Sequence, residues 1–249
     1  MKAADTPTEG VTEFMDTTGK PGRGTVPVLT TDTQDERARL ESALIEHRRH
    51  LQELPPGATA VDRARVELEI AAALLGLGRG AEAWEPARRA FDAFVAAEHW
   101  AEAVEAADIL YQTDQAESLV ALGNGLWLAV TYPIPPELSV RLLHHVVEET
   151  PDHSDGGAVA AVAAHYIADL RGEGREKEDL IFLTGQVVAE VAKRHRGIED
   201  PESIDVWVEM LELNNPDVLF ERLGRIVDVI VDGKWWYDRE ALRARLPVN

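Results

Sequence analysis

Signals that start and stop helices divide the chain, from Gln34 to the C-terminus, into segments of ordinary helix length. Within these segments the apolar residues recur three and four positions apart. In residues 157–171 they occupy positions 159, 162, 163, 166, 167 and 170, which is the period of a helix and not the alternation of a strand. No run of β-branched or aromatic residues bounded by turn residues indicates a strand. The sequence therefore predicts an all-α fold of about ten antiparallel helices, either a helical bundle or a stack of helical hairpins.

The individual helix boundaries follow from capping residues, prolines and glycines. Thr59, with Asp62 three residues later, has the spacing of a capping box, and Asp114 with Glu117 predicts another helix start in the same way. An N-cap residue is followed directly by proline at 200–201 and again at 215–216. The predicted helices cover about residues 34–53, 59–76, 80–97, 100–111, a fifth after 114, 136–150, 157–171, 176–196, 201–213, 216–231 and a short last one after 238.

The chain is strongly acidic, with 45 Asp and Glu against 25 Lys and Arg and a net charge of −20. The excess is spread evenly over both halves of the chain, as on a solvated surface. Nucleic acid and anionic membrane surfaces are bound through basic patches, which this balance disfavours. The expected partner is another protein, with a basic surface or peptide as one alternative. No catalytic residue and no cofactor is predicted, because the sequence has no cysteine nucleophile, phosphate-binding loop or zinc-hydrolase motif.

The longest uncharged stretch, residues 118–136, approaches the length of a membrane span. It contains Gly123, Asn124, Gly125 and three prolines, so it predicts a buried helix with a break, and no membrane insertion is expected. The first residues lack the apolar segment of a secretory signal. The expected location is therefore the cytoplasm.

Residues 1–33 differ in composition from all that follows. They hold nine threonines, four glycines, three prolines and a single aromatic residue, Phe14. Such a segment buries too little apolar surface to offset the entropy lost on ordering. We predict a disordered tail over 1–33 and one all-helical domain over 34–249, with a sub-division near 133–136 as an alternative.

Small residues recur at one spacing in two neighbouring parts of the chain. Steps of 12 and 7 residues occur twice, 35 residues apart, at Ala71, Ala83 and Ala90 and at Ala106, Ser118 and Gly125. Small side chains at such positions let the helices of a hairpin approach closely. Over about residues 62–130 the chain thus resembles the tetratricopeptide family, whose helical hairpins repeat every 34 residues. The phrase GRGAEAW (78–84) is similar to that family's inter-helix turn, and the resemblance implies a stack of hairpins.

Histidines and carboxylates around residue 150 form the best candidate for chemistry. Three pairs lie four residues apart and three more such residues lie in the loop: His144/Glu148, His145/Glu149 and His165/Asp169, with Asp152, His153 and Asp155. If the two helices pack antiparallel, His144 or His145 could face His165 and bind a divalent metal with nitrogen and oxygen ligands. This predicts, as one alternative function, a metal-dependent helical enzyme using the His144/His165 region. The competing interpretation is a polar helix end with carboxylates in solvent.

The same loop carries a second resemblance. In the stretch EETPDHSD (148–155), Glu149 to His153 resemble the Glu-x-Pro-x-Asp-His hinge of redox-enzyme maturation chaperones of the NarJ/TorD type. Those chaperones are acidic, cytoplasmic, all-helical and of similar length, and they bind signal peptides of molybdoenzymes. The resemblance implies a second alternative function, a cytoplasmic assembly chaperone for a larger redox enzyme.

Three consecutive aromatic residues, Trp235, Trp236 and Tyr237, follow Lys234. Because three neighbours are not expected to enter one core together, we predict that one tryptophan is structural and that the other, with Tyr237, is available to a partner. The tryptophans at 84, 100, 127 and 207 lie at helical spacing among apolar residues and are predicted to be core. Since no catalytic motif is present, the favoured function is a non-enzymatic protein–protein interaction module, a helical scaffold, adaptor or accessory protein.

Overall fold

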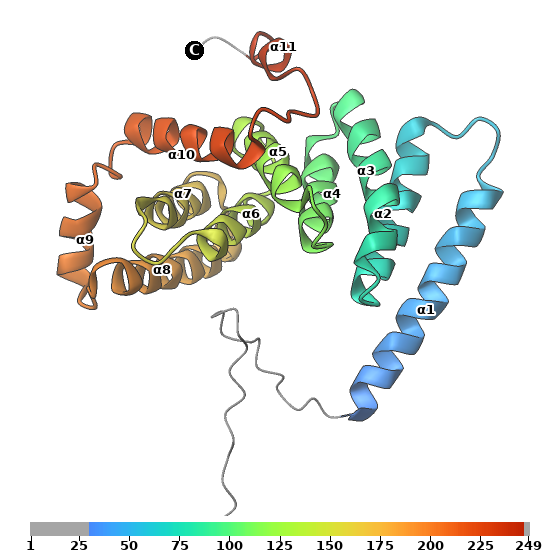
Figure 1. Ribbon diagram of the computed structural model, residues 1–249, viewed down its shortest axis with the longest axis horizontal. Coiled ribbons are helices and arrows are strands. Elements are labelled where there is room, and N and C mark those ends of the chain that lie inside the picture. The colour runs from blue at the N-terminus through green and yellow to red at the C-terminus, as the bar shows by residue number, and fades with distance from the viewer. Residues whose placement is uncertain (1–29, 247–249) are drawn as a thin grey trace, which may run out of the picture.

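The computed structural model describes the backbone of residues 30–246 and the side chains of residues 34–246. Within this range it has eleven helices and no strand, so the predicted all-α fold is confirmed (Figure 1). The helices are α1 (Thr30–Glu53), α2 (Ala60–Gly76), α3 (Gly80–Ala96), α4 (Trp100–Gln112), α5 (Ser118–Thr131), α6 (Pro136–Glu149), α7 (Asp155–Arg171), α8 (Gly174–Arg196), α9 (Pro201–Met210), α10 (Pro216–Val231) and α11 (Arg239–Arg243). The predicted tail lies outside the described residues, except that residues 30–33 are the first turn of α1.

Capping residues explain most of these boundaries. At the start of α2 the amide of Asp62 donates to Thr59 Oγ1 at 3.1 Å, and the amide of Thr59 donates to Asp62 Oδ2 at 3.0 Å, which confirms the predicted capping box. The predicted start at Asp114 is wrong. Asp114 has a φ of 55°, whereas an N-cap residue is extended. Helix α5 begins instead at Ser118, whose hydroxyl accepts from the amide of Gln115 at 2.8 Å.

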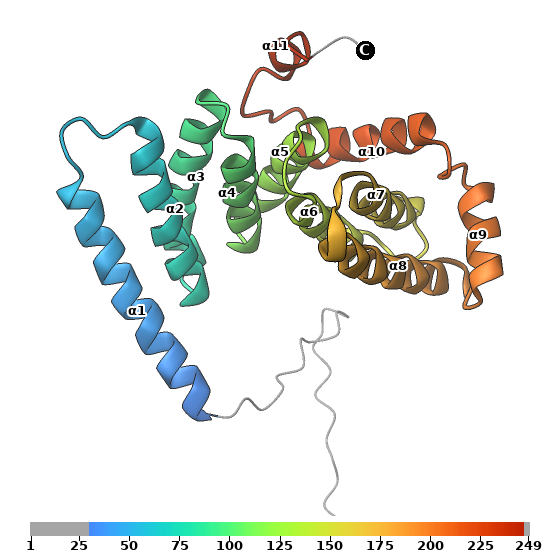
Figure 2. The ribbon, with the colours of Figure 1, turned by 180° about the vertical axis from the view of Figure 1, so that it is seen from behind.

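Alternate helices form a layer. Consecutive helices from α1 to α8 pack against each other, and α2, α4, α6 and α8 also contact one another in that order. Helix α10 does not follow this order, because it packs against both α5 and α7, which come earlier in the chain (Figures 1 and 2). The buried hydrophobic residues other than Val120 form one cluster from Leu44 to Leu242, which includes Ile134 of the connection near 133–136.

Helix α5 is the most enclosed helix, with 11 of its 14 residues buried. It runs unbroken through Gly123 and Gly125, and the break predicted within residues 118–136 lies after Thr131, before α6 begins at Pro136. A Cβ on Gly125 would lie 2.4 Å from Ala107 Cβ of α4, and one on Gly123 would lie 2.5 Å from Val231 Cγ2 of α10. Glycine at both positions therefore lets α4 and α10 approach α5 closely. Burial between helices explains why residues 118–136 carry no charge. None of the described helices is both long and apolar enough to cross a bilayer.

The small residues singled out by their spacing are all buried: Ala71, Ala83, Ala90, Ala106, Ser118 and Gly125. This is the packing that the spacing predicts, while the tetratricopeptide resemblance itself stays a prediction. Of the four tryptophans predicted to be core, Trp127 and Trp207 are buried, and Trp84 and Trp100 are half-buried against the core.

Candidate functional site

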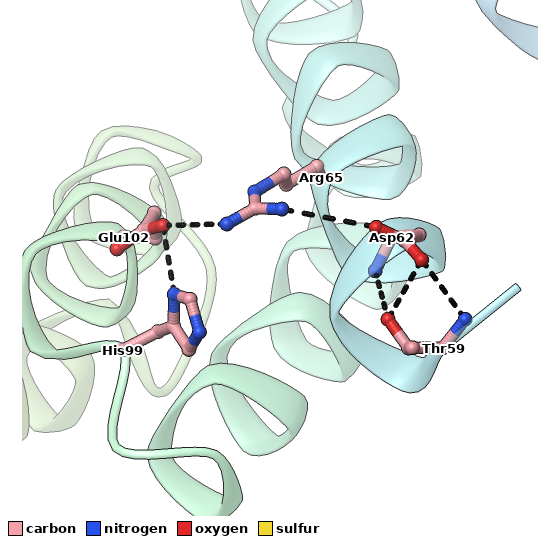
Figure 3. Close-up of polar contacts among 5 residues, drawn as sticks. All are labelled: Thr59, Asp62, Arg65, His99 and Glu102. Atoms are coloured by element: carbon pink, nitrogen blue, oxygen red, sulfur yellow. Dashed lines mark hydrogen bonds and ion pairs between the residues drawn. The ribbon is translucent and has the colours of Figure 1, made fainter.

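The contact between α2 and α4 is closed by charged side chains. Arg65 of α2 lies 3.3 Å from Glu102 Oε1 of α4, and the same oxygen lies 3.0 Å from His99 Nδ1 (Figure 3). Asp62 of the capping box lies 3.8 Å from Arg65 and extends the chain of charges. Burial raises the pKa of Glu102, but the hydrogen bonds with His99 and Arg65 outweigh it and hold that pKa below its ordinary value. Glu102 is thus held in its charged form, and its ion pair with Arg65 joins the two helices.

The contact between α4 and α6 is closed by a buried carboxylate. Asp108 is only 3% exposed and accepts hydrogen bonds from Arg141 at 3.1 Å and from His145 at 2.9 Å. Burial raises the pKa of Asp108, but the hydrogen bonds with His145 and Arg141 outweigh it and leave the pKa lowered. Burial likewise lowers the pKa of His145, but hydrogen bonds to Asp108 and Glu148 leave it raised. Both shifts favour the charged forms, so Asp108 and His145 tie α4 to α6 as an ion pair.

The contact between α6 and α8 is different, because it contains an apolar groove of about 280 Å³. We define the α6/α8 groove by its lining residues: Glu137, Val140, Arg141, His144 and Val147 of α6, Ala164 of α7, and Leu180, Leu183, Thr184 and Val187 of α8. Leu183 is 52% exposed at its rim, and the neighbouring Phe182 is 70% exposed. Between the described residues of α6 and α8 there is no ion pair. They are joined by a hydrogen bond from Arg194 to the carbonyl of Val147, at 2.7 Å.

Some polar side chains of the α6/α8 groove lie next to an oppositely charged side chain, and others do not. Glu137, in the first turn of α6, has a buried Oε1 to which no residue that the structure describes donates a hydrogen bond. Its carboxylate lies beside Glu176 in the first turn of α8. The hydrogen bond with Glu137, and then the charge of Glu137, raise the pKa of Glu176. Arg141 and His144, by contrast, are paired with Asp108 at 3.1 Å and with Glu148 at 3.7 Å. The groove therefore combines apolar walls with carboxyl groups that no Lys or Arg of the described residues pairs with.

The predicted metal ligands are not brought together. His144 pairs with Glu148, as its spacing predicts, but His145 turns toward α4, and its partner on α6 is Glu148 at 3.3 Å rather than Glu149. His165 Nδ1 lies 3.0 Å from Thr184 Oγ1 of α8. In the part of the chain that the structure describes, no group of three or more His, Asp or Glu side chains is arranged to hold a metal ion.

The residues of the second resemblance form the turn between α6 and α7. Glu149 accepts a hydrogen bond from the hydroxyl of Tyr111 at 2.8 Å, while Asp152 and His153 are exposed. Asp155 has a structural role, because it lies 2.8 Å from Arg222 of α10 and 3.2 Å from the buried His195 of α8. Nothing in this geometry tests the resemblance to maturation chaperones, which stays a prediction.

Trp235, Trp236 and Tyr237 are all half-buried, so the prediction that one tryptophan is structural and that the other, with Tyr237, is available to a partner stays a prediction. All three rings of residues 235–237 pack against the core, with Trp236 edge-on to Phe91 at 5.3 Å. The hydroxyl of Tyr237 donates to the carbonyl of Asn124 at 2.7 Å, and the side chain of Asn124 accepts from the amide of Trp236 at 3.0 Å. The segment is neither helix nor strand, so consecutive side chains reach different parts of one core. It fastens the end of the chain to α3 and α5.

The α6/α8 groove was not found from the sequence. Its two walls are amphipathic helices whose patterns predict ordinary core packing. One feature of the sequence does point to exposed apolar surface on this helix. Phe182 and Leu183 lie beside the stripe of buried residues Leu180, Thr184 and Val188.

Comparisons of the chain with models of known protein families, with curated proteins and with solved structures give no match.

Proposed function

We propose that the protein is a non-enzymatic helical scaffold that binds another protein through the α6/α8 groove. The observation that carries this proposal is that the α2/α4 and α4/α6 contacts are closed by ion pairs, whereas the equivalent α6/α8 contact is open and apolar. An apolar hollow with a few polar groups at its edge is the usual form of a ligand site.

The size and surroundings of the groove favour a protein partner over a small molecule. A cavity of about 280 Å³ is at the lower edge of the range for ligand pockets, roughly 300–1,000 Å³, and is large enough for a few side chains of a partner. Phe182 and Leu183 continue its apolar surface onto the exposed side of α8. Exposed apolar surface beside a pocket is typical of a protein interaction site.

His145, next to the groove residue His144, faces α4 and does not line the groove. Both ring nitrogens of His145 face carboxylates, Nε2 toward Asp108 at 2.9 Å and Nδ1 toward Glu148 at 3.3 Å. A general base needs a ring nitrogen that can reach the proton of a substrate, and His145 has both nitrogens occupied. This arrangement supports a structural role for His145.

The proposal is tested by photo-crosslinking in an extract of the native host. One variant carries the photo-reactive amino acid at Leu183, and the matched control carries it at Ile45, which is 71% exposed on α1 and lines no groove described here. We expect one protein to be crosslinked from position 183 and not from position 45. Crosslinking from neither position, or equally from both, would contradict the proposed function.

A further inference from the structure

We infer that the α6/α8 groove binds a partner segment in which an aliphatic side chain lies next to a lysine or arginine. This inference rests on the proposed function and adds the chemistry of the partner. It follows from two parts of the groove, the apolar walls and the carboxylates at one end.

The apolar walls define the first half of the ligand. Val140, Leu180 and Val187 come from facing helices, and Ala164 of α7 also lines the groove. All four side chains are aliphatic, and none offers a hydrogen bond. The free energy of binding at such walls comes from removing apolar surface of both partners from water. An aliphatic side chain of the partner meets this requirement.

The carboxylates define the second half of the ligand. Glu137 lines the groove and has a buried oxygen without a hydrogen-bond partner, and Glu176 lies beside it. The hydrogen bond with Glu137 and the charge of Glu137 raise the pKa of Glu176, so two ionised carboxylates here repel each other, while the buried Glu137 Oε1 has no donor among the described residues and loses its hydration without compensation. An ammonium or guanidinium group of the partner supplies the missing donor and neutralises the repulsion.

The cation must come from outside the groove. Arg141 and His144, the two basic side chains in the lining, already pair with Asp108 and Glu148. The net charge of −20 also attracts basic segments toward the protein over longer range. Charge complementarity therefore selects a basic partner segment rather than an acidic or a neutral one.

A selection of random linear peptides on the immobilised full-length protein tests this inference. We expect the selected peptides to combine Leu, Ile or Val with an adjacent Lys or Arg. Glu137→Gln and Glu176→Gln should each weaken binding of such a peptide about ten- to hundredfold, the range for loss of a charge-assisted hydrogen bond. The matched control is Glu190→Gln, which removes the same charge from an exposed position on α8 outside the groove lining and should leave the dissociation constant unchanged.

Two further results separate this inference from the proposed function. Peptides that lose binding with Leu183→Asp but carry no basic residue, or that bind Glu137→Gln as well as the unchanged protein, would overturn the inference and leave the function standing. If no selected peptide loses binding with Leu183→Asp, the proposed function fails as well. Circular dichroism of each variant checks that the helices are retained.

Discussion

The α4/α6 and α6/α8 contacts join helices of the same layer, but they use carboxylates in opposite ways. Between α4 and α6, Asp108 is neutralised by Arg141 and His145. Between α6 and α8, Glu137 meets a second carboxylate, Glu176. A buried carboxylate that is paired with cations is compatible with a stable fold, whereas an unpaired one costs free energy until a ligand neutralises it. The first contact thus holds the chain together, and the second is the contact through which we propose that the protein binds a partner.

The largest expected difference is in the free energy of unfolding, between a variant in the aromatic cluster that covers α3 and a variant on the exposed surface of α8. Trp236 contacts Phe91 at 5.3 Å and Trp84 at 6.3 Å, and the guanidinium of Arg88 lies 4.0 Å from its ring centroid. Trp236→Ala should lower the free energy of unfolding by about 3 kcal/mol. Phe182→Ala should change it by less than about 0.5 kcal/mol, because that side chain is exposed. Urea denaturation measures both, and similar losses for the two variants would contradict the difference.

The next prediction compares the two carboxylates directly. Asp108→Asn leaves Arg141 and His145 without their counter-ion and should cost about 2–3 kcal/mol of unfolding free energy. Glu137→Gln removes a repulsion and should leave stability within about 0.5 kcal/mol or raise it slightly. Chemical denaturation of both variants is the measurement. A large loss of stability with Glu137→Gln would show that Glu137 supports the fold and does not serve a ligand.

Gly125 of α5 and Gly185 of α8 differ in how closely neighbouring helices pack against them. Gly125→Ala would place a Cβ 2.4 Å from Ala107 Cβ, whereas the nearest atom to a Cβ on Gly185 of α8 is 4.0 Å away. Gly125→Ala should therefore destabilise by about 1–3 kcal/mol through overpacking. Gly185→Ala should stabilise by up to about 1 kcal/mol, because alanine favours the helix. Thermal unfolding followed by circular dichroism gives both values, and equal effects would contradict the difference in packing.

The smallest expected effect concerns pH. The pKa of His145 is raised in the folded protein, so its contribution to stability is complete below the unfolded pKa of about 6.5 and is lost as the pH rises through the folded pKa. The pKa of Asp108 is lowered, so its contribution is lost as the pH falls through the folded pKa. The loss of stability between pH 6 and about pH 9 should be smaller in His145→Gln than in the unchanged protein, and the two losses should differ by about 1 kcal/mol or less. In an Asp108→Asn background His145→Gln should alter this profile less, and an equal effect in both backgrounds would contradict the ion pair.

Local signals made much of the fold predictable. Thr59 with Asp62, and the prolines after Asp200 and Asn215, mark helix starts because capping involves residues that are adjacent in sequence. Non-local contacts were not predictable in this way. The bond between Asp108 and His145 joins residues 37 positions apart, and the identity of the partner depends on how α4 and α6 pack.

Other features that the sequence does not reveal have the same origin. Gly123 and Gly125 do not show which helices lie against them: α4 and α10 pack closely on α5 there, and the break predicted within residues 118–136 lies between α5 and α6. Irregular backbone and the buried Asn124 bring all three rings of residues 235–237, each half-buried, against the core. The α6/α8 groove arises from what two helices leave unfilled between them, and one helical pattern does not reveal such a space.

The most direct test of the difference between these contacts is methyl NMR of the full-length protein during titration with the tightest-binding selected peptide. We expect chemical-shift changes concentrated at Val140, Leu180, Leu183 and Val187, with none at Val66 of α2 or Val104 of α4. Shift changes centred on α2 and α4, or on the core around residues 235–237, would contradict the assignment of the open α6/α8 contact as the binding site.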